Sequence, residues 1–253
     1  MEADYQYKMI AREILEETAR KKGLLNKEHM EKDYFQDLLL FHIYKQTNLL
    51  VFKGGTALYK LYGLQRFSED LDFSILAELD VNEIIKNALV NIEFSEIKEI
   101  KKIKDTILIK IAFKGVITRY NTLRVDINLK NQVLEKFDVR SYVSSYIDIN
   151  PFSLRVLNLK EVVAEKIHAI FNREIARDLY DLFFLLKFVD LDKPLISEKL
   201  SLFNLEMDYN IFKKRINNLA SLWEKELKSF ILSELPDFNA VSNFVLDKIK
   251  TLK

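Results

Sequence analysis

The chain has 253 residues, of which 49% are hydrophobic and 12% aromatic, so it can bury a substantial core and is not a disordered sequence. Its formal net charge of +1 excludes a global attraction to polyanions, and the lack of cysteine excludes disulfides and thiolate metal sites. No apolar run approaches the roughly 20 residues that a membrane span needs, and the charged start MEADYQYKMIAREILEE does not fit a signal peptide. These features predict a cytoplasmic protein with no membrane partner.

The first third of the chain predicts helices arranged around two short strands. Hydrophobic residues recur at helical spacing within 29–47, and Leu71, Phe73 and Ile75 alternate with polar residues as they do in a strand. In chain order, the predicted elements are helices at 6–22 and 29–47, a strand at Leu49–Phe52, a short helix at Thr56–Leu61, a strand around 71–75 and a helix at 82–91.

The rest of the chain changes from strand patterns to helix patterns. Strands are predicted at Thr106–Phe113, Thr122–Leu129 and Phe152–Val156, whereas residues 131–150 support no assignment. A helix is predicted over 159–172, and the pattern is helical from Asp178 onward. The sequence therefore predicts an α+β fold, with an α/β core and its N-terminal helices over 1–155 and an α-helical part over 156–253.

A candidate anion site lies in the segment KGGTALYKLYGLQRFSEDLDFSI, residues 53–75. Gly54 and Gly55 follow a predicted strand and precede a predicted helix, where glycine lets the backbone approach a ligand and the first helical N–H groups attract an anion. The spacing is neither that of a P-loop nor that of a dinucleotide-binding fingerprint. A plain turn is the alternative interpretation of these two glycines.

Carboxylates on two predicted strands form a candidate metal site. Asp70 and Asp72 share one strand face, and such paired carboxylates suit Mg²⁺ with phosphate oxygens as its remaining ligands. Asp126 lies on a later strand, with Arg124 and Asn128 on its own face. If the two strands pair, three carboxylates converge and can hold one or two metal ions. The alternatives are a solvated strand face and, on an edge strand, a salt bridge of Asp126 with Arg124 or a neighbour.

This segment resembles a known motif. Gly-Gly-Thr, a short helix, and then Arg66, Ser68 and Asp70-Leu71-Asp72 are similar to the first motif of the minimal nucleotidyltransferases of the polymerase-β superfamily. Within that superfamily, the segment most resembles the AbiEii-type toxins of bacterial abortive-infection and type IV-like toxin–antitoxin systems.

A second segment, about 95 residues later, resembles the later motifs of the same toxins. It runs from Lys160–Ile170, which contains Lys166, through Arg173 to Arg177–Leu182, which contains Asp178 and Asp181. By spacing alone, Lys166 is an ordinary solvated lysine and the second part is a helix start in which Arg177 pairs with Asp181. His168 is expected to pack rather than react. The resemblance covers about residues 50–185.

The resemblance implies a polymerase-β-like nucleotidyltransferase core with a small mixed β-sheet, followed by an α-helical part that completes the site. It implies a nucleoside triphosphate (NTP) substrate and a Mg²⁺ or Mn²⁺ cofactor. The catalytic residues would be Asp70, Asp72, Lys166 and Asp178. The metal ligands would be Asp70 and Asp72, with Asp126 as the third carboxylate that some minimal members use. The nucleotide would be bound by Lys53, Gly54, Gly55, Thr56, Arg66, Ser68 and Lys166, with support from Arg173, Arg177 and Asp181.

The resemblance also implies a function. A toxin of this kind would transfer a nucleoside monophosphate (NMP) to an RNA acceptor, plausibly the 3′ end of tRNA, and so block translation, and a cognate antitoxin would neutralise it. Independent support for RNA is modest and comes from basic stretches, of which the longest contains Lys98, Lys101, Lys102, Lys104, Lys110 and Lys114.

Three alternatives stay open at this point. The same fold could transfer a nucleotide to a protein or to a small molecule such as an antibiotic. The chain could be a metal-dependent nuclease that uses Asp70, Asp72, Asp126 and Lys166, or a non-catalytic binding subunit with a decayed site.

Overall fold

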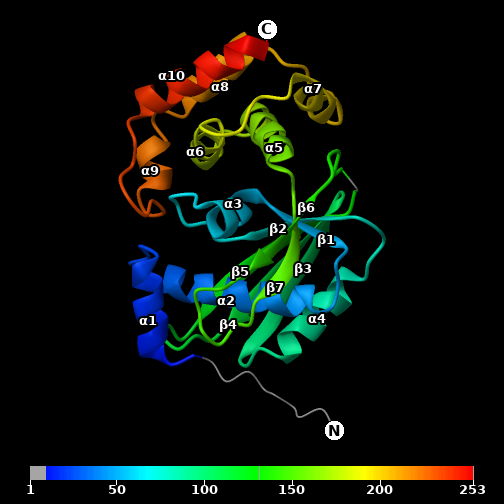
Figure 1. Cartoon of the computed structure of the whole chain (residues 1–253), viewed down its shortest axis with the longest axis vertical. Helices are drawn as coiled ribbons and strands as arrows, with labels where there is room; N and C mark the ends of the chain where they lie inside the picture. Colours follow the sequence, from blue (N-terminus) through cyan, green and yellow to red (C-terminus); the bar gives the residue numbers. More distant parts are fainter. Residues whose placement is uncertain (1–9, 131, 253) are drawn as a thin grey trace. The chain divides into compact units, whose positions relative to one another are not determined.

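The computed structural model describes residues 10–130 and 132–252, and these residues divide into two compact units. The first unit contains the described residues up to Ala57 together with Phe67–Gln132 and Phe137–Val156. The second unit contains the described residues from Leu157 on. It also takes in Leu58–Arg66 and Val133–Lys136, two segments that sequence order alone places in the first domain. Figure 1 shows the elements of both units.

A mixed sheet with the strand order β3-β4-β5-β2-β1-β7-β6 forms the centre of the first unit, as far as the structure describes it. Strand β2 runs parallel to β5 and β1 parallel to β7, and the other neighbours are antiparallel. The strands are β1 (Leu50–Lys53), β2 (Leu71–Ile75), β3 (Ser95–Ile103), β4 (Thr106–Phe113), β5 (Asn121–Asn128), β6 (Asp138–Tyr142) and β7 (Phe152–Val156).

The two edge strands of the sheet, β3 and β6, were not predicted, so the sheet is larger than the sequence suggested. Strand β3 reads SEIKEIKKI, and from Lys98 on it is exposed on both faces, so it lacks the alternation that burial of one face imposes. Strand β6 lies in the unassigned stretch 131–150 and buries only its last residue, Tyr142. Edge strands are therefore the ones that hydrophobic periodicity fails to indicate.

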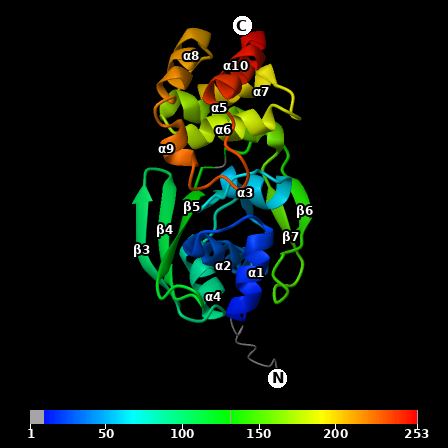
Figure 2. The same ribbon diagram turned by 90° about the vertical axis from the view of Figure 1, so that its left-hand side faces the viewer.

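Helix α2 (Lys27–Tyr44) supports the sheet, and α1 (Arg12–Lys21) and α4 (Val81–Val90) pack beside it. Figure 2 shows α2 and α4 between the two ends of the curved sheet. The side chain of Asn26 caps α2 by accepting hydrogen bonds from the N–H groups of Glu28 and His29. The predicted helix at 6–22 begins at Arg12 in the described part, and residues 6–9 lie outside it.

The core of the first unit lies between α2 and one face of the sheet. Ile109 and Ile111 of β4 and Val125 of β5 are fully buried there, and the ring of Phe35 on α2 stacks 3.9 Å from that of Phe113. Each such side chain contributes about 1.5–3 kcal/mol when it leaves water. The alternate residues of β4 and β5 point to the opposite face of the sheet, and that face carries the polar residues.

The second unit is helical, and α5 packs against α6, α7 and α8. Side chains of Asn158, Asp192, Asp208 and Asp237 cap four of its helices. The elements are α5 (Leu159–Asn172), α6 (Ala176–Leu185), α7 (Lys193–Ser201), α8 (Tyr209–Asn218), α9 (Trp223–Leu227), α10 (Phe238–Ile249) and the 3₁₀ turn η1 (Lys250–Leu252). No helix in the described ranges is long and apolar enough to span a membrane.

A buried ion pair explains why residues 133–136 belong to the helical unit. The carboxylate of Glu161 on α5 accepts hydrogen bonds from the backbone N–H groups of Leu134 and Glu135. The Nζ atom of Lys199 lies 2.6 Å from the same carboxylate, and both side chains are buried. Because a buried charge is costly without a partner, these contacts hold the loop after β5 to α5.

Candidate functional site

Strands β2 and β5 bring two of the predicted carboxylates side by side. In their parallel pairing, Asp72 lies directly opposite Asp126, and Asp70 precedes β2 by one residue. The predicted pairing of these two strands is therefore confirmed. Asp70 and Asp72 lie on the polar face of the sheet, because Leu71 and Phe73, which alternate with them, are fully buried. Asp126 lies opposite Asp72 and projects from the same face.

The Gly54 turn lies against Asp72. Strand β1 ends at Lys53, which is paired opposite Asp72, and helix α3 (Gly54–Tyr62) begins directly after it. Gly54 has φ +74°, and a Cβ atom at this position would collide with the carboxylate of Asp72. Both the left-handed backbone and the close approach require glycine here. The predicted glycine turn and the aspartate strand thus meet at one place in the first unit.

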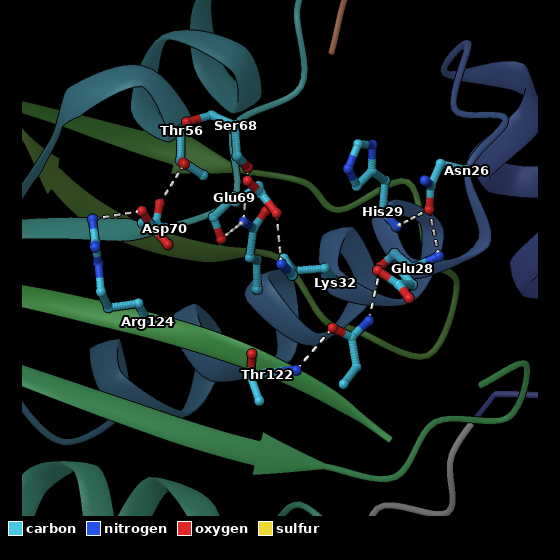
Figure 3. A network of polar contacts seen from close by, with 12 residues as sticks. Asn26, Glu28, His29, Lys32, Thr56, Ser68, Glu69, Asp70, Thr122 and Arg124 are labelled. Carbon is cyan, nitrogen blue, oxygen red and sulfur yellow. Dashed lines mark hydrogen bonds and ion pairs between the residues drawn. The ribbon is translucent and has the colours of Figure 1, made fainter. Parts of the chain in front are cut away.

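The segment before β2 is fixed by contacts to its backbone. The hydroxyl of Thr56 donates to the carbonyl of Asp70, as Figure 3 shows. The amide of Gln36 on α2 donates to the carbonyls of Ser68 and Glu69 at 2.9 and 2.8 Å. Thr56 is therefore a positioning residue in this structure, since its hydroxyl holds the aspartate segment. Sequence reasoning missed Gln36, because a lone glutamine in a distant helix carries no signal.

Arg124 binds two of the three carboxylates. Its Nη2 atom lies 2.8 Å from Oδ2 of Asp70, as Figure 3 shows. Its Nε atom lies 3.1 Å from Oδ1 of Asp126. This is the salt bridge that the sequence offered as an alternative to metal binding. The sequence indicated this salt bridge because Arg124 and Asp126 share one strand face. The expectation placed it on an edge strand, whereas β5 lies in the interior of the sheet.

The donor set of this strand pair fits a hard cation. Carboxylate oxygens from adjacent strands are suitable ligands for Mg²⁺, which completes its shell with water or phosphate oxygens. Among the described residues, no three Asp, Glu, His or Cys side chains are already gathered as a metal cluster. A cation shared by Asp70 and Asp126 would have to compete with Arg124, whose side chain is 54% exposed. The carboxylates therefore suit a divalent cation by their oxygen ligands and by their positions on adjacent strands.

The helical unit contains a separate cluster of charged side chains. Lys166 on α5 places its Nζ atom 2.9 Å from Asp178 and 2.7 Å from Asp181, one turn apart on α6. Arg66 donates twice to Asp181, both times at 2.7 Å, and Arg173 donates twice to Asp178 at 2.8 and 3.1 Å. Three cations thus surround two carboxylates, which leaves an excess of one positive charge.

The lysine and the two carboxylates of this cluster are held in their charged forms. Burial favours the neutral ammonium of Lys166, but Asp178 and Asp181 outweigh it and raise the pKa of Lys166. Burial likewise opposes ionisation of Asp178, but Lys166 and Arg173 hold the pKa of this carboxyl well below its usual range. Attraction to Arg66 and Lys166 lowers the pKa of Asp181 in the same way, against the effect of its burial.

Two expectations for the helical segment have different outcomes. The predicted pair between Arg177 and Asp181 is wrong: Arg66 and Lys166 bind Asp181, and the guanidinium of Arg177 lies 5.3 Å from the ring centre of Phe230. The spacing of four residues allows that pair on a helix, but Arg66 and Lys166, from other parts of the chain, bind the carboxylate instead. His168 stacks on Phe203 with ring centres 3.8 Å apart, as expected of a packing residue.

Comparison with known proteins identifies the family. The sequence model described as "Nucleotidyl transferase AbiEii toxin, Type IV TA system" matches residues 38–244. The chain belongs to the AbiEii nucleotidyltransferase toxin family. It is accordingly a nucleotidyltransferase, and both groups of charged residues described above lie inside the matched range. No curated protein matches the sequence.

Solved structures share the fold of this AbiEii family member. MenT4, a nucleotidyltransferase toxin from Mycobacterium tuberculosis, aligns with a TM-score of 0.63 at 20% identity, over 94% of this chain and 89% of that one. JHP933 from Helicobacter pylori aligns with a TM-score of 0.61 at 20% identity, over 90% of this chain and 93% of that one. At such identities the likeness concerns the fold alone.

Proposed function

We propose that this toxin transfers NMP from an NTP to an RNA acceptor in the cytoplasm, in a reaction that depends on Mg²⁺ or Mn²⁺, and that the acceptor is the 3′ end of tRNA. A modified 3′ end cannot carry an amino acid, so the reaction would block translation, and a cognate antitoxin would relieve the block. Membership of the AbiEii family supports nucleotidyl transfer and the toxin role.

The observation that carries the proposal is the arrangement of Gly54, Asp72 and Asp126. The two carboxylates lie opposite each other on parallel strands, and the glycine turn at the start of α3 packs against one of them. Asp70, Asp72 and Asp126 would hold the metal, and the backbone of Gly54 and Gly55 would receive phosphate oxygens. When bound, a divalent cation would neutralise charge on the triphosphate.

The proposed step conserves atoms and charge. The 3′ hydroxyl oxygen of the acceptor forms a bond to the α-phosphorus of the NTP, and the bond from that phosphorus to the bridging β-phosphate oxygen breaks. Pyrophosphate leaves, and the hydroxyl proton passes to a carboxylate of the strand pair. No covalent enzyme intermediate is needed, so the residues of the site act by positioning and by charge.

Lys166 is proposed to act on the triphosphate charge. Asp178 and Asp181 hold its ammonium in one position, while Arg66 and Arg173 compensate these carboxylates. The cluster therefore keeps a net positive charge that can attract phosphate oxygens. In this scheme Asp178 and Asp181 position the lysine, and the two arginines support them.

The test is a transfer assay with total tRNA, Mg²⁺ and each of the four NTPs labelled in turn. We expect label on RNA for the wild type and a loss of at least about 100-fold for Asp72→Asn, because the carboxylate charge disappears. Asp190→Asn is the matched control, since Asp190 belongs to the other Asp-x-Asp of the chain and is exposed. Thermal melting should show that both variants stay folded.

The same assay separates the alternatives. Label on an added protein or antibiotic instead of RNA would replace the proposed acceptor while keeping nucleotidyl transfer. Cleavage of RNA without NTP would indicate a nuclease that uses the same carboxylates. An active and toxic Asp72→Asn variant would remove Asp72 from the site.

A further inference from the structure

Two exposed aromatic rings flank a lysine at one end of the sheet. Phe94 precedes β3, Lys114 follows β4 and Tyr120 precedes β5, each by one residue, so they extend the cross-strand row of Ser95, Phe113 and Asn121. The side chains of Phe94 and Tyr120 are 65% and 60% exposed. With a lysine between them in one cross-strand row, the two rings form a local group rather than single scattered surface residues.

This row shares a sheet face with the carboxylates of the candidate site. Along β5, Tyr120, Arg124 and Asp126 are separated by even numbers of residues, so they project from the same face. On the neighbouring strand β4, Lys110 pairs with Arg124 and is exposed. The opposite face is the one buried against α2. The path from Tyr120 to Asp126 is about 20 Å long, which accommodates several nucleotides.

The loop that presents Tyr120 is anchored to α2. The buried carboxylate of Glu31 accepts hydrogen bonds from the backbone of Ile117 and from both the backbone and the hydroxyl of Thr118. A Cβ atom on Gly115 would collide with this carboxylate, so the loop wraps closely around it. These contacts keep the aromatic row in place before any ligand arrives, which lowers the entropy cost of binding.

Phe94 has an unfavourable backbone conformation. Its φ of +56° lies in the left-handed region, where a bulky side chain costs roughly 1 kcal/mol or more. Glycine would adopt the same conformation without strain. The backbone of Phe94 is held by a 3.0 Å hydrogen bond from the N–H of Lys114, whose Nζ atom lies 5.2 Å from the centre of the Phe94 ring. Stability alone does not account for an aromatic residue at this position.

The charge of this face suits a polyanion. Lys98, Lys110 and Lys114 are exposed on it. Two glutamates lie beside them: Glu96 pairs with Lys98, and Glu99, which lies opposite Lys110 in the strand register, pairs with Lys101. Glu96 raises the pKa of Lys98 by accepting its hydrogen bond, and Tyr120 adds to this effect. Four lysines against two glutamates leave a positive surface beside two aromatic rings. This combination is typical of surfaces that bind single-stranded nucleic acid, where bases stack and phosphates meet cations.

We propose that this aromatic–lysine face, defined by Phe94, Tyr120, Lys98, Lys110 and Lys114, binds a single-stranded stretch of RNA acceptor. Phe94 and Tyr120 would stack bases, and the lysines would contact phosphates, with the 3′ end directed along β5 toward Asp126. The inference rests on the proposed RNA acceptor. Stacking and phosphate contacts accept every base, so this face supplies affinity and direction rather than sequence choice.

Binding of a labelled 12-nucleotide single-stranded RNA, without NTP or metal, tests the face by fluorescence anisotropy. We expect Phe94→Gly and Tyr120→Ala each to weaken binding at least about 5-fold, because a stacked base is lost. Lys114→Glu should weaken it further and lower the salt dependence of binding. Phe94→Gly should melt at or above the temperature of the wild type, so its loss of affinity cannot be a folding defect.

Matched controls are Phe188→Ala, which removes another exposed phenylalanine, and Lys45→Glu, which reverses a lysine that also lies over a phenylalanine ring. Both should bind RNA as the wild type does. Equal affinity of wild type and Phe94→Gly, equal losses in the controls, or no RNA binding by the wild type would each overturn the proposal. The proposed function is tested separately. It would be wrong if the transfer assay gave no labelled RNA while the RNA still bound to this face.

Discussion

The strand site and the helical cluster combine aspartates with basic residues in different ways. In the strand site, Asp70 and Asp126 are bound by Arg124, whose side chain is about half exposed. In the helical cluster, Lys166, Asp181 and Arg66 are almost fully buried and share short hydrogen bonds. An exposed ion pair is worth at most about 1 kcal/mol, whereas breaking a buried one costs several.

This difference indicates different tasks. Arg124 can leave its carboxylates at little cost, which would let a metal ion take its place in the proposed site. The helical cluster cannot change partners without destabilising its unit, so it holds a fixed geometry. Variants that distinguish these tasks are given below, from the largest expected effect to the smallest.

Asp181→Asn should destabilise the protein most, by about 3–5 kcal/mol, because Arg66 and Lys166 lose a buried negative partner. Urea unfolding measures this change. Lys166→Met should cost less, since Asp178 keeps Arg173 and Asp181 keeps Arg66. If Lys166 also contacts the triphosphate, Lys166→Met raises the KM for NTP. An Asp181→Asn variant as stable as the wild type would contradict the structural role of the cluster.

Gly54→Ala should cost about 1–3 kcal/mol and most of the transfer activity, because the new methyl group displaces the carboxylate of Asp72. Gly63→Ala is the matched control: Gly63 has a similar φ of +75°, but a Cβ atom there meets no neighbour within 4 Å. Gly63→Ala should therefore show only the cost of a left-handed alanine and keep full activity. Equal activity losses in the two variants would separate Gly54 from the site.

The pH dependence of stability should arise in the first unit. Burial, with a contribution from Lys45, lowers the pKa of His42 on α2 to about 4, whereas the unfolded chain protonates histidine near pH 6.5. Between these values the unfolded state binds more protons, so stability falls as pH falls, by roughly 1–2 kcal/mol after allowance for partial solvation.

His42→Gln should flatten the melting temperature over this pH range. Asp178→Asn should leave the slope there unchanged, because the lowered pKa of Asp178 confines its own contribution to pH values below about 4. An unchanged slope in His42→Gln would show that another group titrates.

Arg124→Gln should change stability by less than about 1 kcal/mol, because the pair is exposed. If Arg124 competes with the metal ion, this variant reaches half-maximal transfer activity at a lower Mg²⁺ concentration. Arg140→Gln, which loses a longer exposed pair with Asp138 on β6, is the control. A higher Mg²⁺ requirement in Arg124→Gln would mean that the arginine supports metal binding.

Much of the fold and part of the site were predictable from local patterns. The alternation around Asp70 and Asp72 and the helical pattern from Asp178 onward are local features. Asp72 lies in the expected strand, Asp70 directly before it, and Asp178 in the first turn of the expected helix. Edge strand β3 was not predicted, because exposure on both faces removes the alternation of hydrophobic and polar residues. The sequence did not predict that Leu58–Arg66 belongs to the helical unit, because this depends on contacts with residues distant in sequence.

The sequence by itself determined the order of the elements, the two motif segments and the resemblance to AbiEii toxins, because backbone preferences and motif spacing are written locally. Only the tertiary structure decided the partners of the charged groups. In the structure, Asp181 pairs with Arg66 rather than Arg177, and Asp70 pairs with Arg124. The turn at Gly54 packs against Asp72. Partner choice depends on burial and on the register of strands and helices, which arise only when distant segments pack together.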